Sequence, residues 1–322
     1  MVNKNSKIYI AGHNGMVGSA CWKELYQSGY HNLIGRSSKQ LNLKNQEDVK
    51  KYLAEEKPDI VIDAAARVGG ILANDQYPFD FLMDNLQIQA NLIETSIQLN
   101  IPRFIFLGSS CIYPKFANQP IKESYLLDGF LEPTNQWYAI AKISGVKLIE
   151  AARKQFKKDY ISLMPTNLYG PGDNFDLNSS HVIPALIRKF SDAKENNNSD
   201  VTLWGTGNPM REFLHVDDLA KAIRFSIENN LKYPIYNIGT GKDITIKNLA
   251  SIIQEIVGHK GKIIWDNTKP DGTPRKLLDT TRVNSEGWSY SIELRSGLEK
   301  TYQWFLSNKE QIRKTSFIGL QD

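Results

Sequence analysis

Two groups of reactive side chains stand near one another in the middle of the sequence. Ser109, Ser110 and Cys111 follow a short apolar run, and Tyr138 and Lys142 come after an intervening loop. Because Tyr138 and Lys142 are four residues apart, a helix would place them on one face. Together the two groups supply hydroxyls, a thiol, a phenol and a cation. Such a set suits proton transfer to an oxygen that lies next to a hydride acceptor.

Tyr138 and Lys142 are the strongest catalytic pair in the sequence. A free phenol has a pKa of about 10 and is a poor acid–base catalyst at neutral pH. A neighbouring ammonium and a cofactor cation favour the phenolate, so we expect Lys142 and the cofactor to lower the pKa of Tyr138. Ser109, at the end of the expected strand, is the first candidate to hold the same substrate oxygen, and Ser110 is the second. The spacing alone would usually describe a surface pair, but its place after a Gly-Ser-Ser strand end favours catalysis.

The elements that position these groups begin with a glycine-rich stretch. Residues 7–12 have a buried-strand pattern, glycines follow at 12, 15 and 18, and residues 19–28 have a helical pattern. Strand, glycine turn and helix are the context that a dinucleotide-phosphate site requires, with the anion on the N–H groups of the helix start. The expected cofactor contacts in this stretch are Gly12, His13, Asn14, Gly15, Met16, Val17 and Gly18.

The end of the second expected strand, residues 31–36, indicates which dinucleotide binds. An acidic residue at that point would bind the ribose 2′-hydroxyl, whereas a basic residue accommodates a 2′-phosphate. The sequence has no acid there and places Arg36 instead. Arg36 could belong to a solvated basic turn, but the pattern favours NADP(H).

Strand and helix patterns then alternate through the first half of the chain. Further strands are expected at 59–63, 103–107 and 160–164, and helices at 79–99 and 138–156. Repeated βα units predict an α/β fold of the Rossmann type, with a doubly wound parallel sheet. Ligands bind such sheets beyond the carboxyl ends of the strands, which is where the reactive side chains are expected.

The regular alternation ends after Pro171. Beyond it the sequence indicates helices at 181–193, 244–257 and 294–305, a strand at 201–204 and a polar loop at 269–276. We therefore expect a smaller α/β substrate domain interleaved with the first. The predicted division gives residues 1–165 plus 213–240 to the dinucleotide-binding domain, and 166–212 plus 241–322 to the substrate domain.

Composition restricts the class of protein further. A length of 322 residues suggests two domains, and 41% hydrophobic with 23% charged residues is typical of a soluble globular protein. A net charge of +4 does not indicate nucleic-acid binding. Two cysteines without a CxxC pair predict no disulfide framework or cysteine-rich metal site, and favour the cytoplasm. We see no signal peptide and no membrane span.

These residues together resemble the extended short-chain dehydrogenase/reductase family, and within it the enzymes that act on GDP-linked 4-keto sugars. The resemblance covers essentially the whole chain. The glycines and the Tyr-x-x-x-Lys spacing are shared across the superfamily, whereas Ser-Ser-Cys and Ser-His-Val-Ile-Pro are much narrower. The motifs that carry the resemblance are residues 12–18, 64–70, 107–114, 164–170, 180–184, 210–218 and 270–276.

The resemblance implies an enzyme that epimerises GDP-4-keto-6-deoxy-D-mannose at C3 and C5 and then reduces the C4 ketone with NADPH. It makes Cys111 and His181 the acid–base pair for epimerisation, and Tyr138 the proton donor to O4. Lys142 also holds the nicotinamide ribose. The further cofactor contacts that it implies are Ala64, Leu107, Gly108, Ser109, Ser110, Pro165, Asn167, Leu168 and His181.

The GDP moiety needs cations and a surface on which the base can stack. An Arg presents a fork that matches phosphate oxygens. The substrate contacts carried over from the family are Lys189, Trp204, Arg211, Asp271 and Lys276, of which Lys189 could instead be an exposed helix residue. The resemblance also implies a homodimer, formed through the helices at 79–99 and 138–156.

The sequence leaves the sugar open. Gln136 and Trp137 precede Tyr138, where a Glu-Pro or similar pair is usual, and Asn14 and Ser38 stand where basic residues are common. An indole beside the catalytic centre could reshape the sugar pocket. A reductase of a GDP-4-keto-6-deoxy-heptose, with or without epimerase activity, is therefore the second interpretation. A non-catalytic NADP(H)-sensing Rossmann protein is a distant third, because such proteins typically lose the Tyr or the Lys.

Overall fold

A computed structural model describes residues 2–177, 179–197, 199–269, 271–310 and 312, and its largest element is a six-stranded sheet. The strand order is β2-β1-β3-β4-β5-β9 and every pairing is parallel, so the carboxyl ends all lie at one edge. The strands are β1 (Ile8–Ala11), β2 (Leu33–Ile34), β3 (Ile60–Asp63), β4 (Arg103–Leu107), β5 (Asp159–Pro165) and β9 (Ile235–Ile238). The predicted doubly wound α/β fold is confirmed.

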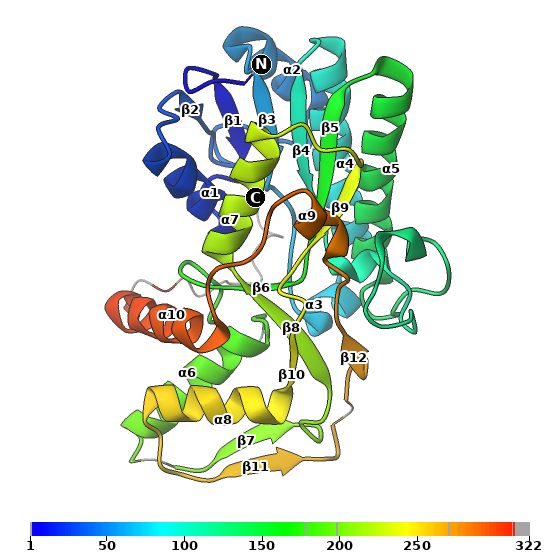
Figure 1. Cartoon of the computed structure of the whole chain (residues 1–322). Coiled ribbons are helices and arrows are strands. Elements are labelled where there is room, and N and C mark those ends of the chain that lie inside the picture. Colours follow the sequence, from blue (N-terminus) through cyan, green and yellow to red (C-terminus); the bar gives the residue numbers. More distant parts are fainter. Residues whose placement is uncertain (1, 178, 198, 270, 311, 313–322) are drawn as a thin grey trace.

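Helices cover both faces of this sheet (Figure 1). Alternate side chains of each strand point to opposite faces, so the strands divide their apolar residues between two clusters. One cluster joins the sheet to α1 and α7, and the other joins it to α2, α4 and α5. The helices are α1 (Met16–Gln27), α2 (Gln46–Glu56), α4 (Pro78–Gln98), α5 (Gln136–Phe156) and α7 (Val216–Glu228). None of the described helices is long and apolar enough to cross a membrane.

A smaller unit with its own apolar cluster lies below the large sheet in Figure 1. Its four-stranded sheet has β8 next to β6, β10 and β12, and a separate pair joins β7 to β11. The strands are β6 (Asn167–Tyr169), β7 (Val201–Trp204), β8 (Met210–His215), β10 (Asp243–Thr245), β11 (Ile263–Asp266) and β12 (Arg275–Lys276); the main helices are α6 (Val182–Glu195), α8 (Ile246–Val257) and α10 (Leu294–Asn308).

The chain leaves the smaller unit through α7, returns to the large sheet as β9, and then comes back as β10. β9 is fastened to the loop after β4 by side-chain hydrogen bonds. The Tyr113 hydroxyl donates to Asn237 Oδ1 at 2.6 Å, and Asn237 Nδ2 donates to the Ile121 carbonyl at 2.9 Å. The two units are therefore interleaved along the chain, while the residue boundaries predicted for the two domains stay a prediction, and residues 313–322 lie outside the described part.

Two short strands in the smaller unit differ from the sequence-based expectation. The helix expected from residue 244 begins at Ile246, because residues 243–245 pair with β8. Thr245 then caps the helix by accepting a hydrogen bond from Asn248 N at 3.1 Å. The polar loop expected at 269–276 ends in β12, which pairs with β8 beside Arg211. Short edge strands have little periodicity of their own, so the sequence does not reveal them. The remaining short elements are α3 (Ile71–Gln76), α9 (Thr281–Ser285) and the 3₁₀ turns at Ser110–Ile112 and Glu123–Tyr125.

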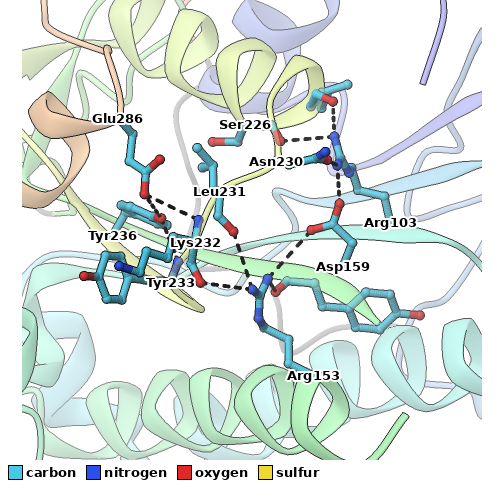
Figure 2. Close-up of polar contacts among 12 residues, drawn as sticks. Arg103, Arg153, Asp159, Ser226, Asn230, Leu231, Lys232, Tyr233, Tyr236 and Glu286 are labelled. Atoms are coloured by element: carbon cyan, nitrogen blue, oxygen red, sulfur yellow. Dashed lines mark hydrogen bonds and ion pairs between the residues drawn. The ribbon is translucent and has the colours of Figure 1, made fainter. Parts of the chain in front are cut away.

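The amino edge of the large sheet is held by a network of paired charges (Figure 2). Arg103, which is 6% exposed, pairs with Asp159 and donates to the Ile227 carbonyl. Arg153 donates to the carbonyls of Leu231 (3.5 Å) and Lys232 (3.3 Å). These bonds fix the loop between α7 and β9 against the starts of β4 and β5.

Candidate active site

The glycine turn between β1 and α1 forms a cradle in which the backbone approaches closely. Gly12 has φ +77°, and a Cβ added there would lie 2.7 Å from the Ala64 carbonyl oxygen. A Cβ on Gly18 would lie 2.2 Å from the Gly12 carbonyl oxygen. Gly15 precedes α1 without a side-chain cap, so the first N–H groups of the helix are available to an anion. The predicted phosphate-binding residues 12–18 thus have the local structure that a pyrophosphate needs.

Arg36 lies just beyond β2, where the 2′-substituent of a bound dinucleotide is expected. Its guanidinium is 5.2 Å from the centre of the Tyr52 ring and 3.4 Å from Glu56 Oε1. Burial and the nearby Arg36 lower the pKa of His13, whose Nδ1 is buried without a partner among the described residues. The His13 ring packs against Gly35, since a Cβ added to Gly35 would lie 2.6 Å from His13 Nδ1, so Arg36 is the group that offers an anion a cation beside the end of β2.

Lys142 and Tyr138 lie in the first part of α5, at the carboxyl end of β4. Lys142 is 3% exposed, and its Nζ donates to the Leu107 carbonyl at 2.9 Å. Its Nζ is 5.9 Å from the centre of the Tyr138 ring. Burial raises the pKa of the Tyr138 phenol, and the nearby Cys111 and Asp63 add to this effect. Desolvation is the largest of these influences, and the expectation that Lys142 and the cofactor cation together lower this pKa stays a prediction.

The strand-end residues Ser109, Ser110 and Cys111 follow β4 directly. Ser109 Oγ accepts a hydrogen bond from Cys111 N at 3.3 Å, which begins the 3₁₀ turn. Ser110 is 4% exposed and points into the protein, whereas Ser109 keeps accessible surface. Burial raises the pKa of the Cys111 thiol, while Lys276, the bond with Ser109 and Lys142 oppose that rise. Ser109 is thus better placed than Ser110 to meet a substrate.

His181 stands immediately before α6 and makes no capping bond with its side chain. The residue is exposed to solvent, yet desolvation by the surrounding protein lowers the pKa of its imidazole. Tyr138 and Lys276 are likewise partly accessible, and desolvation is also the largest influence on their pKa values. No contact between His181 and Cys111 occurs within the described residues.

Three of the predicted GDP contacts come together on the smaller unit. Arg211 in β8 is paired in register with Lys276 in β12. Asp271 raises the pKa of Arg211, although burial lowers it overall. Asp271 accepts from Thr206 N at 2.9 Å and from Thr206 Oγ1 at 2.7 Å. Pro270, the first residue of this motif, lies outside the described part of the chain.

Lys189 and Trp204 lie further along the smaller unit. Lys189 Nζ donates to the Thr202 carbonyl at 3.2 Å, which ties α6 to β7. Trp204, at the end of β7, is 68% exposed, and Lys269 Nζ is 5.6 Å from the centre of its ring. An exposed indole of this kind offers a base a stacking surface. Lys189 is half-buried, and its role as a substrate contact stays a prediction.

The other predicted cofactor contacts lie at the carboxyl ends of the strands. Asn167 has a structural bond, because its Nδ2 donates to the Glu212 carbonyl at 2.8 Å and so ties β6 to β8. A Cβ on Gly108 would lie 2.4 Å from the sulfur of Met164, so this strand end is packed closely against β5. The residues that follow or end strands at this edge are Ala64 after β3, Leu107 and Gly108 at β4, and Pro165 at β5, whereas Leu168 lies within β6 of the smaller sheet.

Two buried acids near the site were not singled out from the sequence. Asp63 ends β3, is 0% exposed, and accepts from Ala65 N at 3.2 Å through Oδ1, while Oδ2 has no partner among the described residues. Burial raises the pKa of Asp63 to about 6, and Lys142 opposes this rise. Glu212 accepts from the N–H groups of Gly241 (2.7 Å) and Leu278 (3.0 Å), so it fixes the loops around the site. An acid that ends an otherwise apolar strand was the available signal for Asp63.

The chain is similar to known proteins in both its sequence and its fold. Residues 8–239 match the model of the NAD dependent epimerase/dehydratase family. The chain is 53% identical to GDP-L-fucose synthase 1 of Arabidopsis thaliana, over 96% of this chain and 95% of the relative. It is 51% identical to GDP-L-fucose synthase of Escherichia coli strain K12, over 95% and 98% respectively. A solved GDP-mannoheptose C4 reductase from Campylobacter jejuni, with NADP bound, has a TM-score of 0.87 and 37% identity, over 95% of this chain and 100% of that one.

Proposed function

Because the chain belongs to the NAD dependent epimerase/dehydratase family, we propose that it catalyses the reaction for which its relatives are named, the synthesis of GDP-L-fucose. The substrate is GDP-4-keto-6-deoxy-D-mannose, which is epimerised at C3 and C5 and reduced at the C4 ketone. The observation that carries the proposal is the convergence of a protonated phenol (Tyr138), a buried ammonium (Lys142) and a thiol (Cys111) at one edge of the sheet.

The reduction uses Tyr138 as the proton donor to the C4 oxygen. Its raised pKa keeps the phenol protonated, which is the form that a general acid needs before the reaction. Ser109 keeps accessible surface beside it and holds the same oxygen. Lys142, fixed by the Leu107 carbonyl, supplies a positive charge under the phenol, which stabilises the phenolate left after proton transfer.

The epimerisation uses Cys111 and His181. Protons on the carbons beside a ketone are acidic enough for side-chain bases to remove. Cys111 comes from the large sheet, whereas His181 begins a helix of the smaller unit, so the two can approach a sugar ring from different sides. One removes a proton and the other returns one to the opposite face, which inverts the carbon.

NADP(H) is the cofactor, and it supplies the hydride when bound. The cradle of Gly12, Gly15 and Gly18 fits a pyrophosphate, because Cβ atoms at Gly12 and Gly18 would collide with backbone. Arg36, just beyond the end of β2, fits a 2′-phosphate. Lys142 holds the nicotinamide ribose.

The GDP moiety lies against the smaller unit. Arg211, next to Lys276 in register, carries the charge that the diphosphate requires. Trp204 presents an exposed indole on which the base stacks. Asp271 and Lys189 complete this group of contacts.

A heptose substrate has less support than the hexose. The named fucose synthases are 51–53% identical to the chain, whereas the heptose reductase is 37% identical. Trp137, which is 39% exposed beside Tyr138, is the feature that keeps the heptose as an alternative.

A homodimer and a cytoplasmic location belong to the same proposal. On α5, Trp137, Ile140 and Leu148 project from one side and are 37–40% exposed, and Phe130 in the preceding loop is 94% exposed. A second copy of the chain would cover this apolar stripe. Both cysteines are free, as a reducing compartment keeps them. Light scattering of Ile140→Glu against the wild type tests the dimer; equal masses would contradict this interface.

One experiment tests the function. The purified protein is incubated with NADPH and GDP-4-keto-6-deoxy-D-mannose, and in parallel with the corresponding heptose, and the products are identified by NMR. We expect GDP-L-fucose from the hexose and slower consumption of the heptose. Preferred turnover of the heptose, or a product with unchanged C3 and C5, would replace the proposal with the alternative.

A further inference from the structure

Glu212 in β8 is bonded to three of the segments through which the chain crosses between the two units. At the first crossing, from β5 to β6, Thr166 Oγ1 donates to the Glu212 carbonyl at 3.2 Å. At the second, from β9 to β10, the N–H groups of Thr240 and Gly241 donate to Glu212 Oε1 at 2.6 and 2.7 Å. At the third, after β12, Leu278 N donates to Glu212 Oε2 at 3.0 Å. One residue thus holds three crossings together.

The third crossing belongs to both units. Residues 275–276 form β12 of the smaller sheet, whereas Leu278 is 1% exposed in the apolar cluster that joins the large sheet to α2, α4 and α5. The chain then enters α9, where Arg282 Nη1 donates to the Ile235 carbonyl of β9 at 2.8 Å. The bond between Leu278 and Glu212 therefore lies at the point where the chain leaves one unit for the other.

The second crossing has a backbone that fits the carboxylate. Gly239 is buried, and a Cβ added there would lie 2.3 Å from Glu212 Oε1. Gly241 has φ +69°, a conformation that residues with a side chain rarely adopt. These glycines allow two N–H groups to donate to one carboxylate oxygen. Hydrogen bonds to an ionised acceptor are roughly twice as strong as bonds between neutral groups, so they hold this crossing close to β8.

Arg211 directly precedes Glu212 in β8, so the two side chains project from opposite faces of the strand. Glu212 is 0% exposed at the crossings, whereas Arg211 is partly accessible and lies beside Lys276 in register. The same strand therefore carries a proposed diphosphate contact on one face and the bonds to the crossings on the other. A displacement of Glu212 would move Arg211 and β12 with it.

The proposed reaction needs groups from both units at one sugar ring. Tyr138 and Cys111 lie at the carboxyl edge of the large sheet, whereas His181 and Arg211 belong to the smaller unit. Among the described strands, none of the large sheet pairs with a strand of the smaller one, so other bonds must fix their relative position. Reacting atoms need to be about 3–3.5 Å apart, and a misplacement of about 1 Å can cost about 10²-fold in rate.

We propose that Glu212 is a positioning residue that fixes the smaller unit relative to the large sheet, and so holds the GDP-sugar contacts in the correct place beside the NADP(H) edge. Because Glu212 is 0% exposed, it acts through the segments that it holds and not by contact with the substrate. Its importance for turnover rests on the proposed function, whereas the three bonded crossings do not.

The variant Glu212→Gln tests the proposal with little change in shape. Its amide oxygen can still accept from Thr240 N and Gly241 N, but its NH2 group then faces Leu278 N, which is also a donor. We expect kcat with NADPH and GDP-4-keto-6-deoxy-D-mannose to fall at least about 10-fold. The dissociation constants of NADPH (by fluorescence) and of GDP (by calorimetric titration) should stay unchanged, because each ligand binds to one unit. A wild-type kcat would overturn the proposal, and so would the loss of either ligand's binding.

A second variant displaces the carboxylate and keeps Glu212. In Gly239→Ala the added Cβ lies too close to Glu212 Oε1, so the flexible side chain must turn away from its donors. We expect the same loss of kcat with unchanged binding, and this variant decides the question if Glu212→Gln does not fold. The matched control is Glu123→Gln, at a carboxylate that is 7% exposed and accepts from Asn237 N at 3.0 Å beside β9. The control should keep the wild-type kcat; an equal loss there would overturn the proposal.

Hydrogen exchange of the protein without ligands tests the crossings independently of the reaction. We expect the N–H groups of Thr240, Gly241 and Leu278 to exchange slowly in the wild type, and that of Leu278 to exchange at least about 10-fold faster in Glu212→Gln. Rapid exchange at all three positions in the wild type would overturn the proposal. Slow exchange in a wild-type protein that does not turn over the sugar would refute the proposed function and keep the three bonded crossings.

Discussion

The two edges of the large sheet differ in how their buried polar groups are hydrogen-bonded. At the amino edge, buried Arg103 satisfies Asp159 and the Ile227 carbonyl, and Arg153 closes the same loop (Figure 2). At the carboxyl edge, Asp63 Oδ2 and His13 Nδ1 are buried without partners among the described residues. An unpartnered buried group costs stability, so Asp63 Oδ2 and His13 Nδ1 carry a cost that the paired Arg103 and Asp159 avoid. This difference indicates that the amino edge stabilises the fold, whereas the carboxyl edge binds ligands.

The largest test of this contrast is Tyr138→Phe at the carboxyl edge. Removing a positioned general acid costs about 10²–10⁴-fold in rate, so we expect NADPH oxidation to fall by that factor. Because the variant also removes a buried hydroxyl, the thermal midpoint should stay the same or rise. Stopped assays and calorimetry measure the two effects, and GDP binding by calorimetric titration is the control. Normal turnover would remove Tyr138 from the reaction.

Arg103→Met should do the reverse at the amino edge. It leaves the Ile227 carbonyl without its buried donor and leaves Asp159, whose side chain is 35% exposed, with Arg153 at 3.7 Å; losing hydrogen bonds to a charged group costs about 1.5–3 kcal/mol. We expect the free energy of unfolding in urea to fall by this amount, with kcat/KM unchanged well below the transition. A large loss of kcat/KM in the folded variant would show that the two edges are not separate.

Asp63→Asn should show a pH-dependent gain. The folded pKa of Asp63 is raised to about 6 from 3.8, so the folded state binds the proton more tightly than the unfolded state. Stability from this group is full below pH 3.8 and is lost as the pH rises through 6, by about 3 kcal/mol at most. The Asp63→Asn variant has no carboxyl group at this position, so its stability does not fall in this way as the pH rises. Urea unfolding at pH 4.5 and 8 should show a stability advantage for the variant that grows with pH; a constant difference would contradict the assignment.

The smallest effect is expected for Glu286→Gln at the amino edge. Glu286 accepts from the Tyr236 hydroxyl at 2.9 Å and from Lys232 N at 3.4 Å, and it is only partly buried. A neutral amide oxygen can still accept both bonds, so the free energy of unfolding should fall by about 1 kcal/mol or less. A loss as large as that of Arg103→Met would show that the network depends on charge even at its rim.

Sequence reasoning succeeded where a pattern has a local cause. The strand at 103–107 and the helix containing Tyr138 and Lys142 appear where the apolar patterns place them, and the glycine turn has the predicted close approaches. The strands β10 and β12 were not foreseen, because they exist only through pairing with β8. The buried acid Asp63 and the depth of the site, which raise the pKa of Tyr138, were also not foreseen, since both depend on the folded sheet. Features with a local cause can be predicted from the sequence, whereas electrostatic effects that depend on the folded structure cannot.

The late arrival of β9 has a consequence for how the chain is made. Five strands of the large sheet lie within residues 8–165. The sixth, β9 (Ile235–Ile238), comes after strands β6 to β8 of the smaller unit along the chain. Until β9 leaves the ribosome, the edge of β5 has no neighbour, and Tyr113 lacks its bond to Asn237. An open apolar strand edge invites wrong pairing between nascent chains. Chains truncated before residue 235 should therefore aggregate although they contain the whole glycine cradle and the Tyr138–Lys142 pair.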